Sequence, residues 1–192
     1  MLRIGALASH GGSILQAVID AISAGTLNAQ IVFIGCNNSD AEVLHRAKKN
    51  GIPAEHISLV HHPNERSLDQ YMTHRFLEVQ ADIILLAGYM RKIGPIMLDT
   101  FTNRIINTHP ALLPKFGGQG FYGRRIHEAV IKSNETETGV TIHLVDKEYD
   151  TGPILIQSKI PIEKNETTLS LEQKVKTHEK SLVVSWLKEL TI

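Results

Sequence analysis

The chain has 192 residues, of which 42% are hydrophobic and 21% are charged, a balance typical of globular proteins and not of disordered chains. Its 20 Lys and Arg residues balance its 20 Asp and Glu residues, which disfavours a dedicated nucleic-acid binder, because such proteins need a basic surface. The single cysteine, Cys36, excludes an internal disulfide and a cysteine zinc site, and no apolar stretch reaches the roughly 18 residues of a membrane helix.

From these totals we expect one domain over residues 1–192, with no membrane partner, no nucleic-acid partner and no bound metal. The start of the chain, Met1–Gly5, lacks the pattern of a cleaved leader, and one unpaired cysteine is compatible with a reducing compartment. We therefore expect a cytoplasmic location.

Short apolar runs alternate with segments of helix length in the first 110 residues. Runs rich in Ile, Val and Leu predict strands buried on both faces at Leu2–Ala8, Ala29–Gly35 and Asp82–Ala87. The segments between them predict helices over Ser13–Ala24, Asp40–Asn50 and Asn64–Gln80, with Asp40 and Asn64 as N-caps. This order predicts an α/β protein with a doubly wound, mostly parallel sheet that is Rossmann-like in its N-terminal half.

The second half of the chain has a different order of elements. A further strand is predicted at Arg104–Thr108, followed by a glycine-rich loop over Leu112–Gly123 and a helix over Arg124–Ser133. A pair of strands, Thr138–Val145 and Pro153–Ile160, flanks the turn Asp146–Gly152, and a long helix over Leu169–Leu190 follows. We expect a functional loop at that turn.

A glycine loop, Ser9–Ser13, comes where the first strand meets the first helix. Free N–H groups at a helix start favour phosphate, and glycine lets the backbone approach it closely. The loop lacks both GxGxxG and the P-loop pattern, so it favours a monophosphate over a dinucleotide or triphosphate. The alternative is a tight turn with Ser13 as N-cap and no ligand.

Asn107 and His109 are two residues apart in a predicted strand and therefore point to the same face. An amide donor and an imidazole can together stabilise the oxyanion that forms on an attacked carbonyl. If Asp150 folds back beside His109, its carboxylate orients the ring and favours the imidazolium. The alternative is that Asp150 only makes a turn and that His109 is a satisfied polar residue at a strand end.

These segments together resemble the phosphoribosylglycinamide formyltransferases, a family of folate-dependent enzymes, over nearly the whole chain. The resemblance rests on the glycine loop and on four further segments: Leu86–Arg91, Asn107–Lys115, Gly139–His143 and Asp150–Ile154. It implies the formyltransferase fold, and transfer of a formyl group from the co-substrate 10-formyltetrahydrofolate to the primary amine of 5′-phosphoribosylglycinamide in de novo purine biosynthesis. Residues 1–110 would bind the phosphate, and residues 111–192 would complete the folate and catalytic sites.

The resemblance also implies a role for individual residues. His109 would be the general acid, Asn107 would hold the formyl oxygen, and Asp150 would raise the pKa of His109 and relay the amine proton. Residues implied to bind the phosphate and the rest of the amine substrate are Gly11, Gly12, Ser13, Ile14, Lys176, Thr177, His178 and Glu179. Residues implied to bind folate are Arg66, Met90, Arg91, Lys92, Ile93, Asn107, His143, Asp146, Lys147, Glu148, Tyr149 and Asp150.

The chain departs from the family pattern at Ile14, where the family usually has asparagine, and in the longer loop 116–123, which we expect to cover the active site. Other formyl-folate enzymes are alternatives: a transferase acting on an aminosugar nucleotide or on initiator methionyl-tRNA, or a formyltetrahydrofolate hydrolase. We expect neither the additional C-terminal domain of the tRNA enzyme nor the N-terminal regulatory domain of the hydrolase. A non-catalytic phosphoribosyl- or nucleotide-binding module is the alternative outside enzymes. The sequence predicts no oligomeric state.

Overall fold

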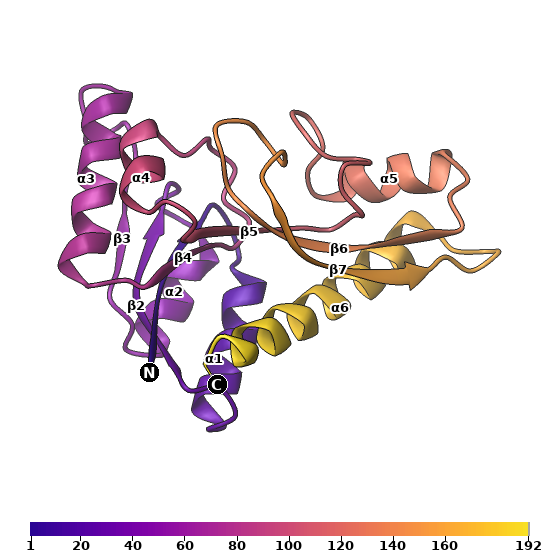
Figure 1. Cartoon of the computed structure of the whole chain (residues 1–192), viewed down its shortest axis with the longest axis horizontal. Helices are drawn as coiled ribbons and strands as arrows, with labels where there is room; N and C mark the ends of the chain where they lie inside the picture. Colours follow the sequence, from indigo (N-terminus) through magenta and orange to yellow (C-terminus); the bar gives the residue numbers. More distant parts are fainter. Residues whose placement is uncertain (192) are drawn as a thin grey trace.

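A computed structural model describes residues 1–191, and its seven strands form one sheet in the order β3-β2-β1-β4-β5-β6-β7 (Figure 1). The strands are β1 (Leu2–Ala8), β2 (Ala29–Cys36), β3 (Ala54–His56), β4 (Ile83–Leu86), β5 (Ile105–His109), β6 (Glu137–Leu144) and β7 (Ile154–Pro161). The helices are α1 (Ser13–Ser23), α2 (Glu42–Lys49), α3 (Glu65–Glu78), α4 (Pro95–Thr100), α5 (Arg124–Lys132) and α6 (Thr168–Glu189).

The pairing of the strands confirms the predicted α/β fold with a mostly parallel sheet. β1 pairs in parallel with β2 and β4, and β2–β3 and β4–β5 are also parallel. β6 runs antiparallel to β5 and to β7, so the strand pair of the second half extends the same sheet. Figure 1 shows β6 and β7 reaching away from the parallel strands, with α6 running back along them toward α1.

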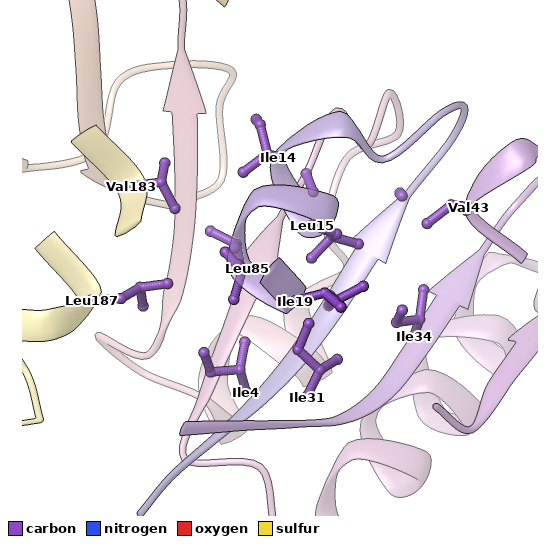
Figure 2. Packing of buried hydrophobic residues seen from close by; sticks show 14 of the residues in the cluster. Ile4, Ile14, Leu15, Ile19, Ile31, Ile34, Val43, Leu85, Val183 and Leu187 are labelled. Atoms are coloured by element: carbon purple, nitrogen blue, oxygen red, sulfur yellow. The ribbon is translucent and has the colours of Figure 1, made fainter. Parts of the chain in front are cut away.

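Helices cover both faces of the sheet, and β1 explains why. Its alternate residues Ile4, Ala6 and Ala8 belong to the apolar cluster that includes α1, α2 and the end of α6, part of which is drawn in Figure 2. Leu7 belongs instead to the cluster on the opposite face, with α3 and α4. Because successive strand residues point to opposite faces, a strand that is apolar except for Arg3 needs cover on both sides.

A third apolar cluster lies between α5, α6 and the two antiparallel strands. It contains Ile126 and Val130 of α5, Leu171 and Val175 of α6, and Val140 of β6. The cluster fixes α5 against α6, and these two helices contribute to the site described below. Within residues 1–191, no helix combines the length and the apolar character needed to cross a membrane.

Two elements were not predicted, and one cap was predicted wrongly. β3 has only three residues, Ala-Glu-His, and therefore shows no apolar run. α4 has six residues, and the buried carboxylate of Asp69 accepts hydrogen bonds from the backbone N–H groups of Ile96 (2.8 Å) and Met97 (3.2 Å) at its first turn. Asn64 caps α3 as expected, whereas α2 begins after Ala41 and has no side-chain cap, so Asp40 is not its N-cap.

Candidate active site

A cavity of about 560 Å³ lies beside the carboxyl ends of β1, β4 and β5. The strand order reverses between β1 and β4, the point at which open α/β sheets usually bind ligands. The loops after the two strands are joined there, because the Ser9 backbone N–H donates to the Gly88 carbonyl at 3.1 Å. The cavity therefore occupies the position that the predicted sheet topology favours.

The glycine loop forms one wall of this cavity, through His10, Gly11, Gly12, Ser13 and Ile14. Gly12 is the N-cap residue of α1 and has a φ of 62°, a left-handed conformation that favours glycine. A Cβ atom at Gly12 would also lie 2.6 Å from Cγ2 of Val43, so both the conformation and the packing require glycine. Ser13 is the first residue of α1 and not its cap, so the expected cap of the ligand-free alternative is wrong.

Asn107, His109 and Asp150 meet at the centre of the site, as the sequence predicted. The His109 Nδ1 atom lies 3.3 Å from Asp150 Oδ2, and the Asn107 side-chain amide donates to Asp150 Oδ1 at 3.4 Å. All three residues line the cavity. A donor, an imidazole and a carboxylate thus converge on one space, which is the arrangement that stabilises a developing oxyanion and moves a proton.

The hydrogen bonds of His109 define which of its nitrogens can exchange a proton. Nε2 lies 2.7 Å from the carbonyl oxygen of Phe116, which can only accept, so Nε2 carries a hydrogen. The atom that gains or loses a proton is therefore Nδ1, which faces Asp150. The Asp150 Oδ2 atom also accepts the backbone N–H of Gly118 at 2.9 Å, so the loop over 116–123 holds both partners.

His143 is a second, buried imidazole behind the trio. Its Nδ1 lies 2.8 Å from the Leu144 carbonyl and must donate to it, and its Nε2 lies 3.1 Å from the Asn107 amide nitrogen. Because that nitrogen can only donate, His143 Nε2 accepts and the ring is neutral in this arrangement. His143 therefore orients Asn107 and does not line the cavity itself, which refines its predicted contact with folate.

Burial lowers the pKa of His109, and the nearby charge of Asp150 and the Phe116 carbonyl oppose this shift without cancelling it. Asp150 thus raises the pKa of His109, as predicted, but burial has the larger effect and the net shift is downward. For Asp150, burial favours the neutral acid, yet the nearby imidazoles of His143 and His109 and the hydrogen bond from the Gly118 N–H together lower its pKa. The site therefore favours the ionised form of Asp150, whereas burial disfavours the charged form of His109.

Helix α6 supplies two of its four predicted residues to the cavity. Lys176 and Glu179 are three residues apart, share one helix face and line the cavity. Glu179 accepts a hydrogen bond from the Thr108 hydroxyl at 2.7 Å, and burial raises its pKa despite that bond. The intervening residues point elsewhere: Thr177 donates to the Gln173 carbonyl, and His178 contacts Ser158 of β7.

The predicted folate residues divide into two groups. Met90, Tyr149, Asp150 and Asn107 line the cavity. The others lie outside its wall and make other contacts. Arg91 pairs with Glu65, and Lys92 pairs with Glu148. Ile93 is buried in the core, and Asp146 accepts hydrogen bonds from Glu148 and Thr151 within its own turn. The exposed Arg66 and Lys147 are likewise not part of the wall.

Several residues of the cavity wall were not predicted individually. The covering loop contributes Gly118, Gln119, Gly120, Phe121, Tyr122 and Gly123, and further residues come from Thr108, Ile126 and His127. The glycine-rich composition of the loop had indicated a cover, but not which side chains face inward. His127 could have been singled out from the sequence, because it is a polar residue on the face of α5 that Ile126 and Val130 bury. Among residues 1–191, no cluster of three His, Cys, Asp or Glu side chains is arranged to hold a metal ion.

Known proteins share this fold and about a third of this sequence. The family model "Formyl transferase" matches residues 2–187. The chain is 35% identical to the chloroplastic phosphoribosylglycinamide formyltransferase of Arabidopsis thaliana, over 95% of this chain but only 63% of that protein. It is 33% identical to the Haemophilus influenzae phosphoribosylglycinamide formyltransferase, over 98% of this chain and 88% of that one. The crystal structure of glycinamide ribonucleotide transformylase 1 from Geobacillus kaustophilus superposes with a TM-score of 0.91 at 34% identity, covering 99% and 98% of the two chains.

Proposed function

The chain belongs to the formyl transferase family, and on that premise we propose that it transfers a formyl group from 10-formyltetrahydrofolate to the primary amine of 5′-phosphoribosylglycinamide. The observation that carries the proposal is the convergence of Asn107, His109 and Asp150 on one cavity beside a glycine loop. A phosphate-binding loop and an oxyanion site in one cavity suit an amine substrate that carries a phosphate and attacks a carbonyl carbon.

The reaction forms one bond and breaks another. The amine nitrogen attacks the formyl carbon, the carbonyl oxygen becomes an oxyanion, and collapse of this intermediate releases the folate nitrogen. One proton leaves the amine and one proton reaches the departing nitrogen, so the protons balance without an external acid. In this proposal the Nδ1 atom of His109 takes part in that proton transfer, because the hydrogen on Nε2 stays on that nitrogen and is donated to the Phe116 carbonyl.

Asn107 and Asp150 have distinct parts in the proposed mechanism. The amide of Asn107 has two hydrogens, held by His143 at 3.1 Å and by Asp150 at 3.4 Å. The longer bond is the one that a formyl oxygen would replace, so Asn107 would keep its orientation through His143 while it stabilises the oxyanion. Asp150 would then stabilise the imidazolium that forms on His109 after proton uptake.

The remaining substrate contacts are assigned to residues that line the cavity. The backbone of Gly11–Ile14 would bind the phosphate, so the side chain of Ile14 in place of asparagine would not remove the binding groups. Lys176 and Glu179 would contact the rest of the amine substrate, and Met90 and Tyr149 would contact folate. We propose that this reaction is a step of purine biosynthesis. The cytoplasmic location stays a prediction, because the Arabidopsis relative is named as chloroplastic.

An assay with two amines tests the proposal. The purified protein is mixed with 10-formyltetrahydrofolate and either glycinamide ribonucleotide or an aminosugar nucleotide, and release of tetrahydrofolate is followed by absorbance. The proposal predicts turnover with glycinamide ribonucleotide and little with the aminosugar nucleotide. Turnover with only the second amine would replace the substrate, and tight binding of both ligands without turnover would favour a binding module.

A further inference from the structure

Thr108 lies between Asn107 and His109 in the chain, but its side chain points to the opposite face of β5. On that face, the residue two positions before it, Ile106, packs in the apolar cluster that includes Val183 of α6. One helical turn before Val183, the carboxylate of Glu179 accepts a hydrogen bond from the Thr108 hydroxyl at 2.7 Å. Both partners are buried and both line the cavity, so this contact ties β5 to α6 at the cavity wall.

The two carboxylate oxygens of Glu179 have different surroundings. Oε1 accepts the hydrogen bond from Thr108, whereas Oε2 accepts none from residues 1–191. Oε2 is nevertheless not enclosed, because the side-chain nitrogen and oxygen atoms that are both enclosed and unpaired in this part of the chain are His127 Nδ1 and Thr138 Oγ1. Since Glu179 lines the cavity and only 8% of its surface is exposed, Oε2 is the oxygen that a ligand in the cavity can reach.

A lysine on the same helix could compete for this carboxylate. Lys176 also lines the cavity, and residues three apart on a helix can form an ion pair. Lys176 Nζ lies instead 2.6 Å from Oε1 of Glu172, and within residues 1–191 no ion pair joins it to Glu179. Because Thr108 binds Glu179 on the side of β5, the lysine and the glutamate both remain available to a ligand.

We propose that Thr108 is a positioning residue for the amine substrate: its hydroxyl holds Glu179 so that Oε2 faces a hydrogen-bond donor of that substrate. This inference rests on the proposed function, which assigns Glu179 to the amine substrate. A glutamate side chain has several rotatable bonds, and fixing them only when the substrate binds would weaken binding. Thr108 fixes them beforehand, from a strand whose position the sheet determines.

The substitution Thr108→Val tests the inference, because valine has nearly the same shape and lacks the hydroxyl. We expect the KM for glycinamide ribonucleotide to rise about fivefold to tenfold, the effect of losing one hydrogen bond, while kcat and the KM for 10-formyltetrahydrofolate change less than about twofold. Thr108→Ser keeps the hydroxyl and is expected to hold the KM within about twofold of the wild type. Thr108→Ala removes the same hydroxyl and replaces the valine variant if that variant does not fold.

Thr138→Val is the matched control. Thr138 is also a buried threonine on a strand, but its hydroxyl has no partner among residues 1–191 and it lies outside the cavity wall. The same chemical change there is expected to leave both KM values unchanged. A rise in the KM for glycinamide ribonucleotide as large as that of Thr108→Val would show that the effect does not come from the contact with Glu179.

A second pair of variants tests whether Thr108 acts through Glu179. In the Glu179→Ala background there is no carboxylate to hold, so adding Thr108→Val is expected to change the calorimetric Kd for glycinamide ribonucleotide less than about twofold. In the wild-type background the same substitution is expected to raise that Kd about fivefold to tenfold. Equal losses in the two backgrounds would overturn the inference.

The outcomes distinguish this inference from the proposed function. An active wild type whose KM for glycinamide ribonucleotide is unchanged in Thr108→Val would overturn the inference alone. So would an equal rise in both KM values together with a lower kcat, because that is the effect of general damage to the site. If the wild type transfers no formyl group, the proposed function fails, and the calorimetric Kd still decides: weaker binding to Thr108→Val only when Glu179 is present supports the inference, and equal binding refutes it.

Discussion

His109 Nδ1 lies 3.3 Å from Asp150 Oδ2, and the backbone of Asp150 adopts a left-handed conformation (φ 59°) at that contact. Phe116, whose carbonyl accepts from the other nitrogen of the same ring, is also left-handed (φ 55°). A residue other than glycine in this region costs about 1 kcal/mol. Both contacts to the His109 ring therefore come from strained positions, which is typical of a functional site.

Removing either Asn107 or His109 is expected to abolish most of the turnover. Asn107→Ala and His109→Ala should each lower kcat by about 10²–10³, because the first removes a preorganised donor to the oxyanion and the second removes the group that transfers the proton. Both variants are expected to stay folded and to bind glycinamide ribonucleotide, which calorimetry checks beside steady-state kinetics. Rates close to those of the wild type in both variants would remove the catalytic assignment.

The carboxylate of Asp150 is expected to set the acid limb of the pH profile. It raises the pKa of His109 against the larger effect of burial, so Asp150→Asn lowers that pKa further. Because the neutral imidazole is the active form on the acid side, the acid limb of kcat/KM should move to lower pH while kcat falls. Glu137→Gln, an exposed position on β6 outside the cavity, provides the control and should leave the limb in place. A limb that does not move in Asp150→Asn would contradict the pairing.

The glycine loop offers a matched pair of substitutions. Gly12 (φ 62°) and Gly25 (φ 68°) are both left-handed, but only Gly12 is packed, since a Cβ there would contact Val43. Gly25→Ala should cost about 1 kcal/mol of stability and leave kinetics unchanged. Gly12→Ala should cost more and also raise the KM for glycinamide ribonucleotide, measured by thermal unfolding and kinetics. Equal effects of the two substitutions on KM would argue against a phosphate site at this loop.

Glu179 is expected to lower the stability of the fold at neutral pH and to contribute to substrate binding. Burial raises its pKa above the ordinary value of 4.5, so its contribution to stability is largest below that pH and is lost as the pH rises. Glu179→Gln removes this loss, and its melting temperature relative to the wild type should increase from about pH 5 to pH 8. The KM for glycinamide ribonucleotide should rise. A relative melting temperature that falls over this pH range would show that Glu179 is not held in its neutral form.

Strand periodicity was sufficient to predict the centre of the site. Asn107 and His109 share one face of β5 because they are two residues apart, and both contact Asp150. Apolar runs and alternation predicted six of the seven strands to within about one residue at each end, because these strands are rich in branched aliphatic residues, although Ile160 is the only buried residue of β7. The exception, Ala54–His56, is a short edge strand with no such pattern.

The contacts that depend on loops could not be predicted. The Phe116 carbonyl and the Gly118 N–H are backbone groups, which every residue has, and only the path of the loop brings them to His109 and Asp150. Asp150 raises the pKa of His109 as predicted, but the larger effect of burial, which depends on the packed structure, could not be predicted. His178 was assigned to the substrate from its place in the sequence, but the helical period turns it toward Ser158.

The identity of the formylated product tests the central claim most directly. The protein is given 10-formyltetrahydrofolate labelled with ¹³C in the formyl group together with glycinamide ribonucleotide, and the label is located by NMR. We predict that the label appears as an amide on the glycinamide nitrogen with the wild type, and that the initial rate of its appearance falls about 10²–10³-fold in His109→Ala. Label released as free formate, or product formation at the wild-type rate in His109→Ala, would contradict formyl transfer by the Asn107, His109 and Asp150 site.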